Sequence, residues 1–341
     1  MKQATLFAVS AILVAGAATT TAQATEWQVT VGAESPGRGS QALAFLPNEL
    51  WVQTGDSIRW TFPTHERHSL TFLTPGQTRP PGFGPTFGVA VGCPGLTPTG
   101  SSFDGTACVT SDILQLDDTQ NAASAQTYSV SFPATGNFKF VCLVHADMTG
   151  MVHVRSLSDT LPHDQDFYDR RAQIEQQRLL ADASSLESRV TPARQDRARS
   201  NSVAAGVGQI VTLAGVGSQT ASLMRFLRGT IVVNVGDTVE WTNQDPSINH
   251  TVTFGTEPTD PRPASTNVTL SSDGARQATI SSPTDNVNSG FLTPTPQDRS
   301  NLAQVAVGIT RFRVTFNSPG TFDYICAVHD TLGMKGTVIV H

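Results

Sequence analysis

The stretch Tyr324–Gly336 reads YICAVHDTLGMKG, and the rest of the chain is arranged around it. Cys326 stands three residues before His329, and Met334 follows five residues after that histidine. A thiol, an imidazole and a thioether therefore share one short loop. Three groups of this kind on one loop indicate a binding site for a soft metal ion rather than a packed core.

The same pattern occurs earlier in the chain, where residues 141–150 read VCLVHADMTG. Each copy also has an upstream histidine in a segment that reads His-x-Leu/Val-Thr-Phe. Two imidazoles, one thiolate and a weak axial thioether are the ligands that suit copper. The candidate ligands are His68, Cys142, His145 and Met148 in the first copy, and His250, Cys326, His329 and Met334 in the second.

The repeat extends well beyond the ligands. Residues 45–60 align without a gap on residues 226–241, with the same Gly-Asp pair in the middle and the same final tryptophan. Apolar residues alternate on either side of that pair, which predicts a strand, a turn and a second strand. Residues 138–142 match 322–326 in the same way. The chain is therefore a tandem duplication of one domain.

Length and composition agree with two all-β domains. A chain of 341 residues is longer than one typical domain. Only 15 % of the residues are charged, whereas glycine, proline, serine and threonine are plentiful, which favours short strands joined by turns. The net charge of −6 provides no basic face for nucleic acid.

The N-terminus has the form of a signal peptide. Lys2 precedes an apolar run from Leu6 to Ala18, and Ala22-Gln23-Ala24 fits a cleavage site after Ala24. The alternative is a membrane anchor, but the run is short for a span of about 20 residues. No other stretch is long and apolar enough to cross a bilayer. We therefore expect an exported protein, periplasmic or extracellular, with no membrane span in the mature chain.

The two cysteines outside the ligand loops lie close together in a turn-rich insertion. Cys93 and Cys108 are expected to form a disulfide, which export permits; two free thiols are the alternative. A bridge between Cys142 and Cys326 is not expected, because it requires the cores of two separate domains to meet.

Between the copies the composition changes. Residues 162–188 are rich in Asp, Glu, Arg and Gln, and apolar residues recur there at helical spacing from Tyr168 to Leu186. We expect one amphipathic helix that ends before Thr191-Pro192 and packs against a domain, followed by a polar linker. The expected division is a signal peptide at 1–24, a first domain at 25–156, a helical linker at 157–202 and a second domain at 203–341.

Taken singly, each candidate ligand is ordinary, since a lone histidine is usually satisfied and a lone buried cysteine is usually inert. The repetition of His, Cys, His and Met in one order reverses that judgement. Met148 aligns with Met334 because each is followed by x-Gly-x-Val, and Met151 remains a weaker alternative axial ligand. His65 could hydrogen-bond near the site, but we expect it to be a solvated loop residue.

With these residues in place, both halves resemble the cupredoxins, the plastocyanin/azurin-like blue copper domains. The second ligand loop is similar to that of plastocyanin and the first to the shorter loop of amicyanin. The resemblance covers most of the mature chain, and implies two Greek-key β-sandwiches joined by the helical linker, each with one type 1 copper ion. It also implies that the histidines and cysteines are equatorial ligands and the methionines axial ones.

The resemblance further implies electron transfer between redox protein partners. The alternative from another class is a copper storage or delivery module with no electron-transfer role. Enzymes with stacked cupredoxin domains place a histidine beside the blue-copper cysteine and use His-x-His motifs. The sequence has neither feature among its 8 histidines, so we expect no enzymatic activity.

Overall fold

The computed structural model describes residues 24–80, 82, 84, 93, 101–117, 124–190, 201–213, 215–294 and 308–341. The expected signal peptide lies outside these residues, apart from Ala24, and so does most of the polar linker.

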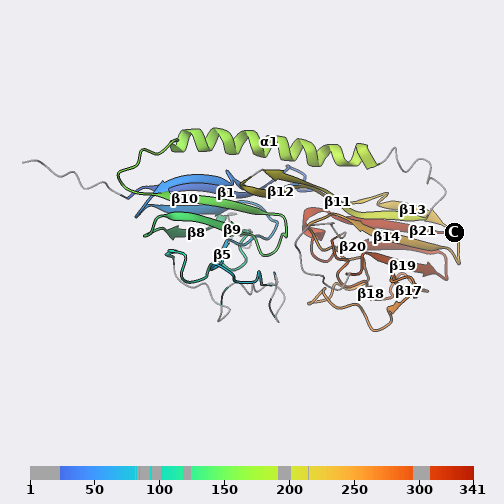
Figure 1. Cartoon of the computed structure of the whole chain (residues 1–341). Coiled ribbons are helices and arrows are strands. Elements are labelled where there is room, and N and C mark those ends of the chain that lie inside the picture. The colour runs from blue at the N-terminus through green and yellow to red at the C-terminus, as the bar shows by residue number, and fades with distance from the viewer. Residues whose placement is uncertain are drawn as a thin grey trace, which may run out of the picture.

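The described strands form three sheets, one of them shared by both halves of the chain (Figure 1). The shared 11-stranded sheet has the order β16 (Thr269–Leu270), β17 (Arg276–Ile280), β19 (Arg311–Phe316), β14 (Thr238–Gln244), β11 (Ser202–Leu213), β12 (Gly217–Leu227), β2 (Ser40–Leu46), β1 (Glu26–Glu34), β4 (Ser57–Phe62), β8 (Ser124–Ser131) and β7 (Leu116–Asp117).

Each half of that sheet packs on a 5-stranded sheet of its own domain. The first is β3 (Glu49–Gln53), β10 (Thr149–Arg155), β9 (Gly136–Val141), β5 (Thr71–Phe72) and β6 (Val109–Thr110). The second is β13 (Thr230–Val233), β21 (Lys335–Val340), β20 (Gly320–Ile325), β15 (Thr253–Phe254) and β18 (Val287–Asn288). The expected all-β sandwiches are therefore present.

The repeated Gly-Asp pair forms the turn that the sequence predicts, between β3 and β4. Gly55 has φ +92°, a left-handed conformation that suits glycine. The buried Asp56 carboxylate accepts hydrogen bonds from the Trp27 indole and from the backbone N–H of Gln53, both at 2.9 Å. After this turn β4 buries alternate residues, as a strand on a core should.

The two domains join edge to edge through β2 and β12. These strands pair antiparallel, with Ala42 opposite Ala221 and Leu43 opposite Thr220. The seam continues one sheet from the first domain into the second, so the sandwiches are fused rather than linked only by the chain. The sequence did not predict this seam.

Helix α1 (Gln165–Val190) covers the seam (Figure 1). It begins where Asp164 accepts a hydrogen bond from the N–H of Phe167. Its buried Leu179 and Ala183 pack on small residues of β2 and β12, and Leu186 packs on residues of β11 and β12. The expected packing face is confirmed, but it contacts both domains. No helix in the described residues has the length and apolarity to span a membrane.

Candidate metal centres

The first centre lies at one end of the first sandwich. His68 is held by backbone hydrogen bonds in both directions with Leu114, at 2.9 and 2.8 Å. Cys142 follows the last residue of β9, and His145 lies in the loop before β10. All three side chains are buried, and their ligand atoms lie within 4.8 Å of one another.

The second centre repeats this construction. His250 exchanges backbone hydrogen bonds with Leu292, at 3.1 and 2.7 Å. Cys326 follows β20, and His329 precedes the 3₁₀ turn η1 (Asp330–Leu332). The structure thus brings together the predicted His, Cys and His of each copy, again within 4.8 Å and buried.

Each cysteine sulfur accepts a hydrogen bond from the backbone. The N–H of Ser69 donates to Cys142 Sγ at 3.4 Å, and the N–H of Thr251 donates to Cys326 Sγ at 3.3 Å. These donors stabilise a thiolate, and they belong to the residues that directly follow the upstream histidines. In each domain, two consecutive residues therefore supply a candidate histidine ligand and a backbone hydrogen bond to the candidate cysteine ligand.

The electrostatics of both centres favour a thiolate. Burial raises the pKa of Cys142, but His145 and His68 lower it by more, so that it falls well below its usual range. Burial likewise raises the pKa of Cys326, and His329 and His250 lower it well below its usual range. A thiolate is the form of cysteine that binds metal.

The nitrogen and sulfur atoms of each cluster are arranged more suitably for binding a metal ion than for hydrogen bonding to one another. The Nδ1 atoms of His250 and His329 lie 3.2 Å apart, and Cys326 Sγ lies 3.8 and 3.3 Å from them. In the first centre, neither ring nitrogen of the fully buried His68 has a hydrogen-bond partner among the described residues. Buried polar atoms normally have partners, so these nitrogens are arranged for one that the polypeptide does not supply.

The two predicted methionines are fully buried next to the cysteines. The N–H of Cys142 donates to the Met148 carbonyl at 2.9 Å, and the N–H of Cys326 donates to the Met334 carbonyl at 3.0 Å. Met151 is only half-buried and lies on β10. The assignment of Met148 and Met334 as axial ligands stays a prediction.

Two glycines that the sequence analysis missed lie against the upstream histidines. Gly32 on β1 and Gly206 on β11 have φ +74° and +71°, and each stands at a shift in strand register. A Cβ atom would lie 2.5 Å from His68 Nε2 at the first and 2.1 Å from His250 Nε2 at the second. Only glycine leaves room for these rings. The signal was their equivalent position in the two copies.

Glu66 is the second residue that sequence reasoning missed. The residue is only 5 % exposed, and its carboxylate lies between the centres, with Oε1 at 3.3 Å from His145 Nε2 and Oε2 at 3.5 Å from His329 Nε2. Burial raises its pKa, but His329 and His145 lower it by more, to about 2. The sequence offered one sign of its importance: the two copies differ at this position, which is Glu66 in the first and Ile248 in the second.

His65, next to Glu66, is not the solvated residue that we expected. Its Nδ1 lies 2.6 Å from Glu34 Oε1, and the side chain is only 13 % exposed. This hydrogen bond compensates for the partial burial, and the local sequence could not reveal its partner.

Arginines hold both ligand loops from outside. Arg79 donates to the carbonyl oxygens of Cys142 and, at 2.9 Å, of His145. Arg225 donates to Leu332 O and to Gly37 O, both at 2.6 Å. Through these two bonds Arg225 links the second domain's ligand loop to the β1–β2 connection of the first domain.

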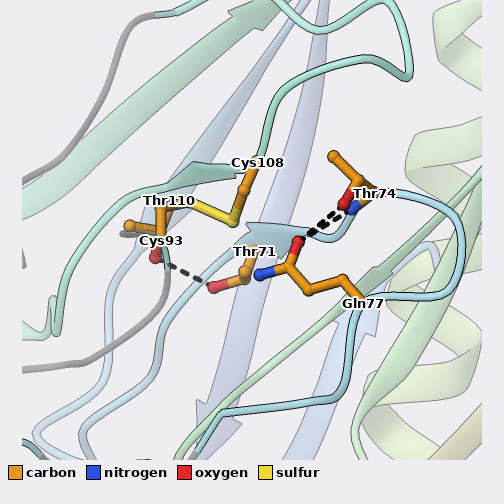
Figure 2. Close-up of a disulfide and its surroundings, with 6 residues drawn as sticks. All are labelled: Thr71, Thr74, Gln77, Cys93, Cys108 and Thr110. Atoms are coloured by element: carbon orange, nitrogen blue, oxygen red, sulfur yellow. Dashed lines mark hydrogen bonds between the residues drawn. A yellow bond between two sulfur atoms is a disulfide. The ribbon is translucent and has the colours of Figure 1, made fainter. Parts of the chain in front are cut away.

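The predicted disulfide joins Cys93 and Cys108 and lies beside β5 and β6 (Figure 2). Thr71 and Thr110, on those two strands, are linked through their hydroxyl groups at 2.9 Å. The disulfide therefore fastens the insertion next to the strand that carries the Thr-Phe end of the histidine segment. Cys142 and Cys326 are both free, as expected.

Similarity to known proteins is found among solved structures and at the level of the family. No curated protein matches. Among solved structures, amicyanin from Paracoccus versutus is 19% identical, with 42% of this chain and 83% of that chain covered and a TM-score of 0.23. A mutant of amicyanin in the Cu(I) form is 20% identical, with coverages of 35% and 74% and a TM-score of 0.20.

The decisive comparison is at the level of the family. The sequence profile described as "Copper binding proteins, plastocyanin/azurin family" matches twice, at residues 33–155 and 213–341. Each match contains one complete His–Cys–His cluster, and together they make up more than half of the chain. The chain therefore belongs to the plastocyanin/azurin family of copper-binding proteins, as a tandem of two cupredoxin domains.

Proposed function

We propose that this protein is an exported blue copper protein that holds one type 1 copper ion in each domain and carries electrons between redox protein partners. The observation that carries the proposal is the presence of two buried His–Cys–His clusters, one in each match to the family. His68, Cys142 and His145 would hold the first ion, and His250, Cys326 and His329 the second. Met148 and Met334 would be their weak axial ligands.

The chain's own residues suit this role because they hold the donors still. A backbone N–H group donates a hydrogen bond to each cysteine sulfur. Gly32 and Gly206 leave room for the rings of His68 and His250 in their observed positions. Bound copper would supply a one-electron couple between Cu(I) and Cu(II). A donor set that does not rearrange suits both oxidation states and keeps the cost of each electron transfer low.

Metal analysis and a visible spectrum of the purified protein test the proposal. We expect two copper ions per chain, an intense blue band from thiolate-to-copper charge transfer, and reversible bleaching by a one-electron reductant. Cys142→Ser and Cys326→Ser should each remove about half of the blue absorbance. A protein that binds only Cu(I), stays colourless in air and releases its copper to an acceptor would instead be a storage or delivery module.

Export has its own test. The signal-peptide pattern at residues 1–24 supports it, and N-terminal sequencing of protein from the native host should begin at Thr25. Recovery of the intact N-terminus would contradict export with cleavage.

A further inference from the structure

We propose that Glu66 is a positioning residue shared by the two copper centres, and that it couples them so that the oxidation state of one shifts the reduction potential of the other. This inference rests on the proposed function, since it concerns copper bound at both clusters. It assigns a role to a first-domain residue in the second domain's centre.

The geometry of the two downstream histidines carries the inference. The Nδ1 atoms of His145 and His329 face the cysteine sulfurs, at 3.7 and 3.3 Å. Their Nε2 atoms face opposite oxygens of Glu66, at 3.3 and 3.5 Å. An imidazole that ligates through Nδ1 carries its proton on Nε2. Both rings can therefore direct the positive end of an N–H bond at the one carboxylate, each at its own oxygen and at ion-pair distance.

The surroundings make this shared charge effective. Glu66 is buried, and the small cavity beside it has a volume of about 20 Å³. Val144 and Ile248 line it from opposite domains, together with the polar Arg67 and Asn249. That volume holds about one water molecule, too little to solvate a carboxylate. A charge buried in this way interacts strongly with its neighbours. The polypeptide between the two centres is thus one ring, one carboxylate and one ring.

The sign of the effect follows from the charge. A buried anion beside a ligand histidine favours the more positive, oxidised state of the metal, so Glu66 lowers the potential of both centres. When one centre passes an electron to a redox partner, its ring becomes more positive and attracts the carboxylate more strongly. The other centre then receives less stabilisation and is harder to oxidise. Each event moves one electron, breaks no bond and leaves both Nε2 protons in place.

The first experiment isolates the effect across the domains. In a Cys142→Ser background the only blue centre is in the second domain, and Glu66→Gln is then added in the first domain. The amide has only one oxygen and no charge, so the Cu(II)/Cu(I) equilibrium of that centre should shift at least tenfold toward Cu(I), a rise of about 59 mV. Glu34→Gln is the matched control, because Glu34 is also a partly buried carboxylate paired with a histidine. An equal potential in the two variants overturns the proposal.

Two further measurements test the coupling and the bridge separately. A redox titration of the unaltered protein should differ from the sum of the titrations of Cys142→Ser and Cys326→Ser; an exact sum shows that the centres are independent. In metal-free protein, nitrogen NMR of the histidines should show Glu66→Gln changing both His145 and His329, and a change at His145 alone refutes the bridge. If the unaltered protein lacks blue copper, the proposed function fails instead.

Discussion

Replacement of Gly206 by alanine tests how the fold places the upstream histidine. The new methyl group would lie 2.1, 2.7 and 2.8 Å from three atoms of the His250 ring, closer than carbon atoms normally approach. Either the ring or the strand must move. The ring's Nδ1 is a candidate ligand atom, so we expect the second-domain blue band to be lost or strongly shifted while the first-domain band persists.

The size of the stability loss can be worked out from two contributions. An L-residue in the left-handed region costs about 1–2 kcal/mol, and forcing an extra methyl group into a packed site costs about 1–3 kcal/mol. The sum predicts a loss of about 2–5 kcal/mol in the free energy of unfolding for Gly206→Ala. Gly236→Ala is the matched control, because its φ is +89° and a Cβ there meets nothing within 4 Å. It should lose only the backbone part, about 1–2 kcal/mol.

The assay is urea unfolding of the metal-free variants, followed by copper titration with visible spectra. Gly32→Ala, the first-domain counterpart, should impair the other band. Equal stability losses for Gly206→Ala and Gly236→Ala, with both blue bands unchanged in the first variant, would refute the reasoning that glycine is needed to make room for the ring.

Other predictions concern the helix, the potentials and the disulfide. Leu179→Ala in α1 should cost about 2–5 kcal/mol of unfolding free energy in chemical denaturation, whereas Ile174→Ala, at a site that is 66% exposed, should cost little. The two centres should have different midpoints in a spectroscopic redox titration, because their ligand loops differ in length; identical single-site midpoints would show that loop length has no electronic effect. Peptide mapping without reduction should recover Cys93 joined to Cys108, and loss of this bridge should cost about 3 kcal/mol; free thiols in natively exported protein would contradict this.

Much of the fold could be predicted because the information was local and present twice. The pattern around Cys326 and its repeat at Cys142 identify the ligand loops, and the shared Gly-Asp turns identify the flanking strands. The spacing of apolar residues predicts that α1 is a helix. Its ends are predicted to within a few residues, because an aspartate caps the start and a proline follows the end.

What could not be predicted depends on contacts between distant residues. β2 and β12 are both strands by pattern, but nothing local says that they pair with each other. Glu66 reads as one more charged loop residue until the two domains are placed, when its oxygens reach histidines of both. The room that Gly206 leaves for His250 is likewise a property of two strands brought together.

Because β2 and β12 pair across the seam, neither domain is expected to remain soluble without the other. If each domain were produced alone, β2 or β12 would become the edge strand of its sheet. Its unpaired N–H and C=O groups could then pair with other chains. The apolar stripe of α1 would also lose the part of its packing surface that belongs to the other domain. Although the sequence reads as two interchangeable modules, a protease or a gene truncation that separates them should yield aggregates rather than two working halves.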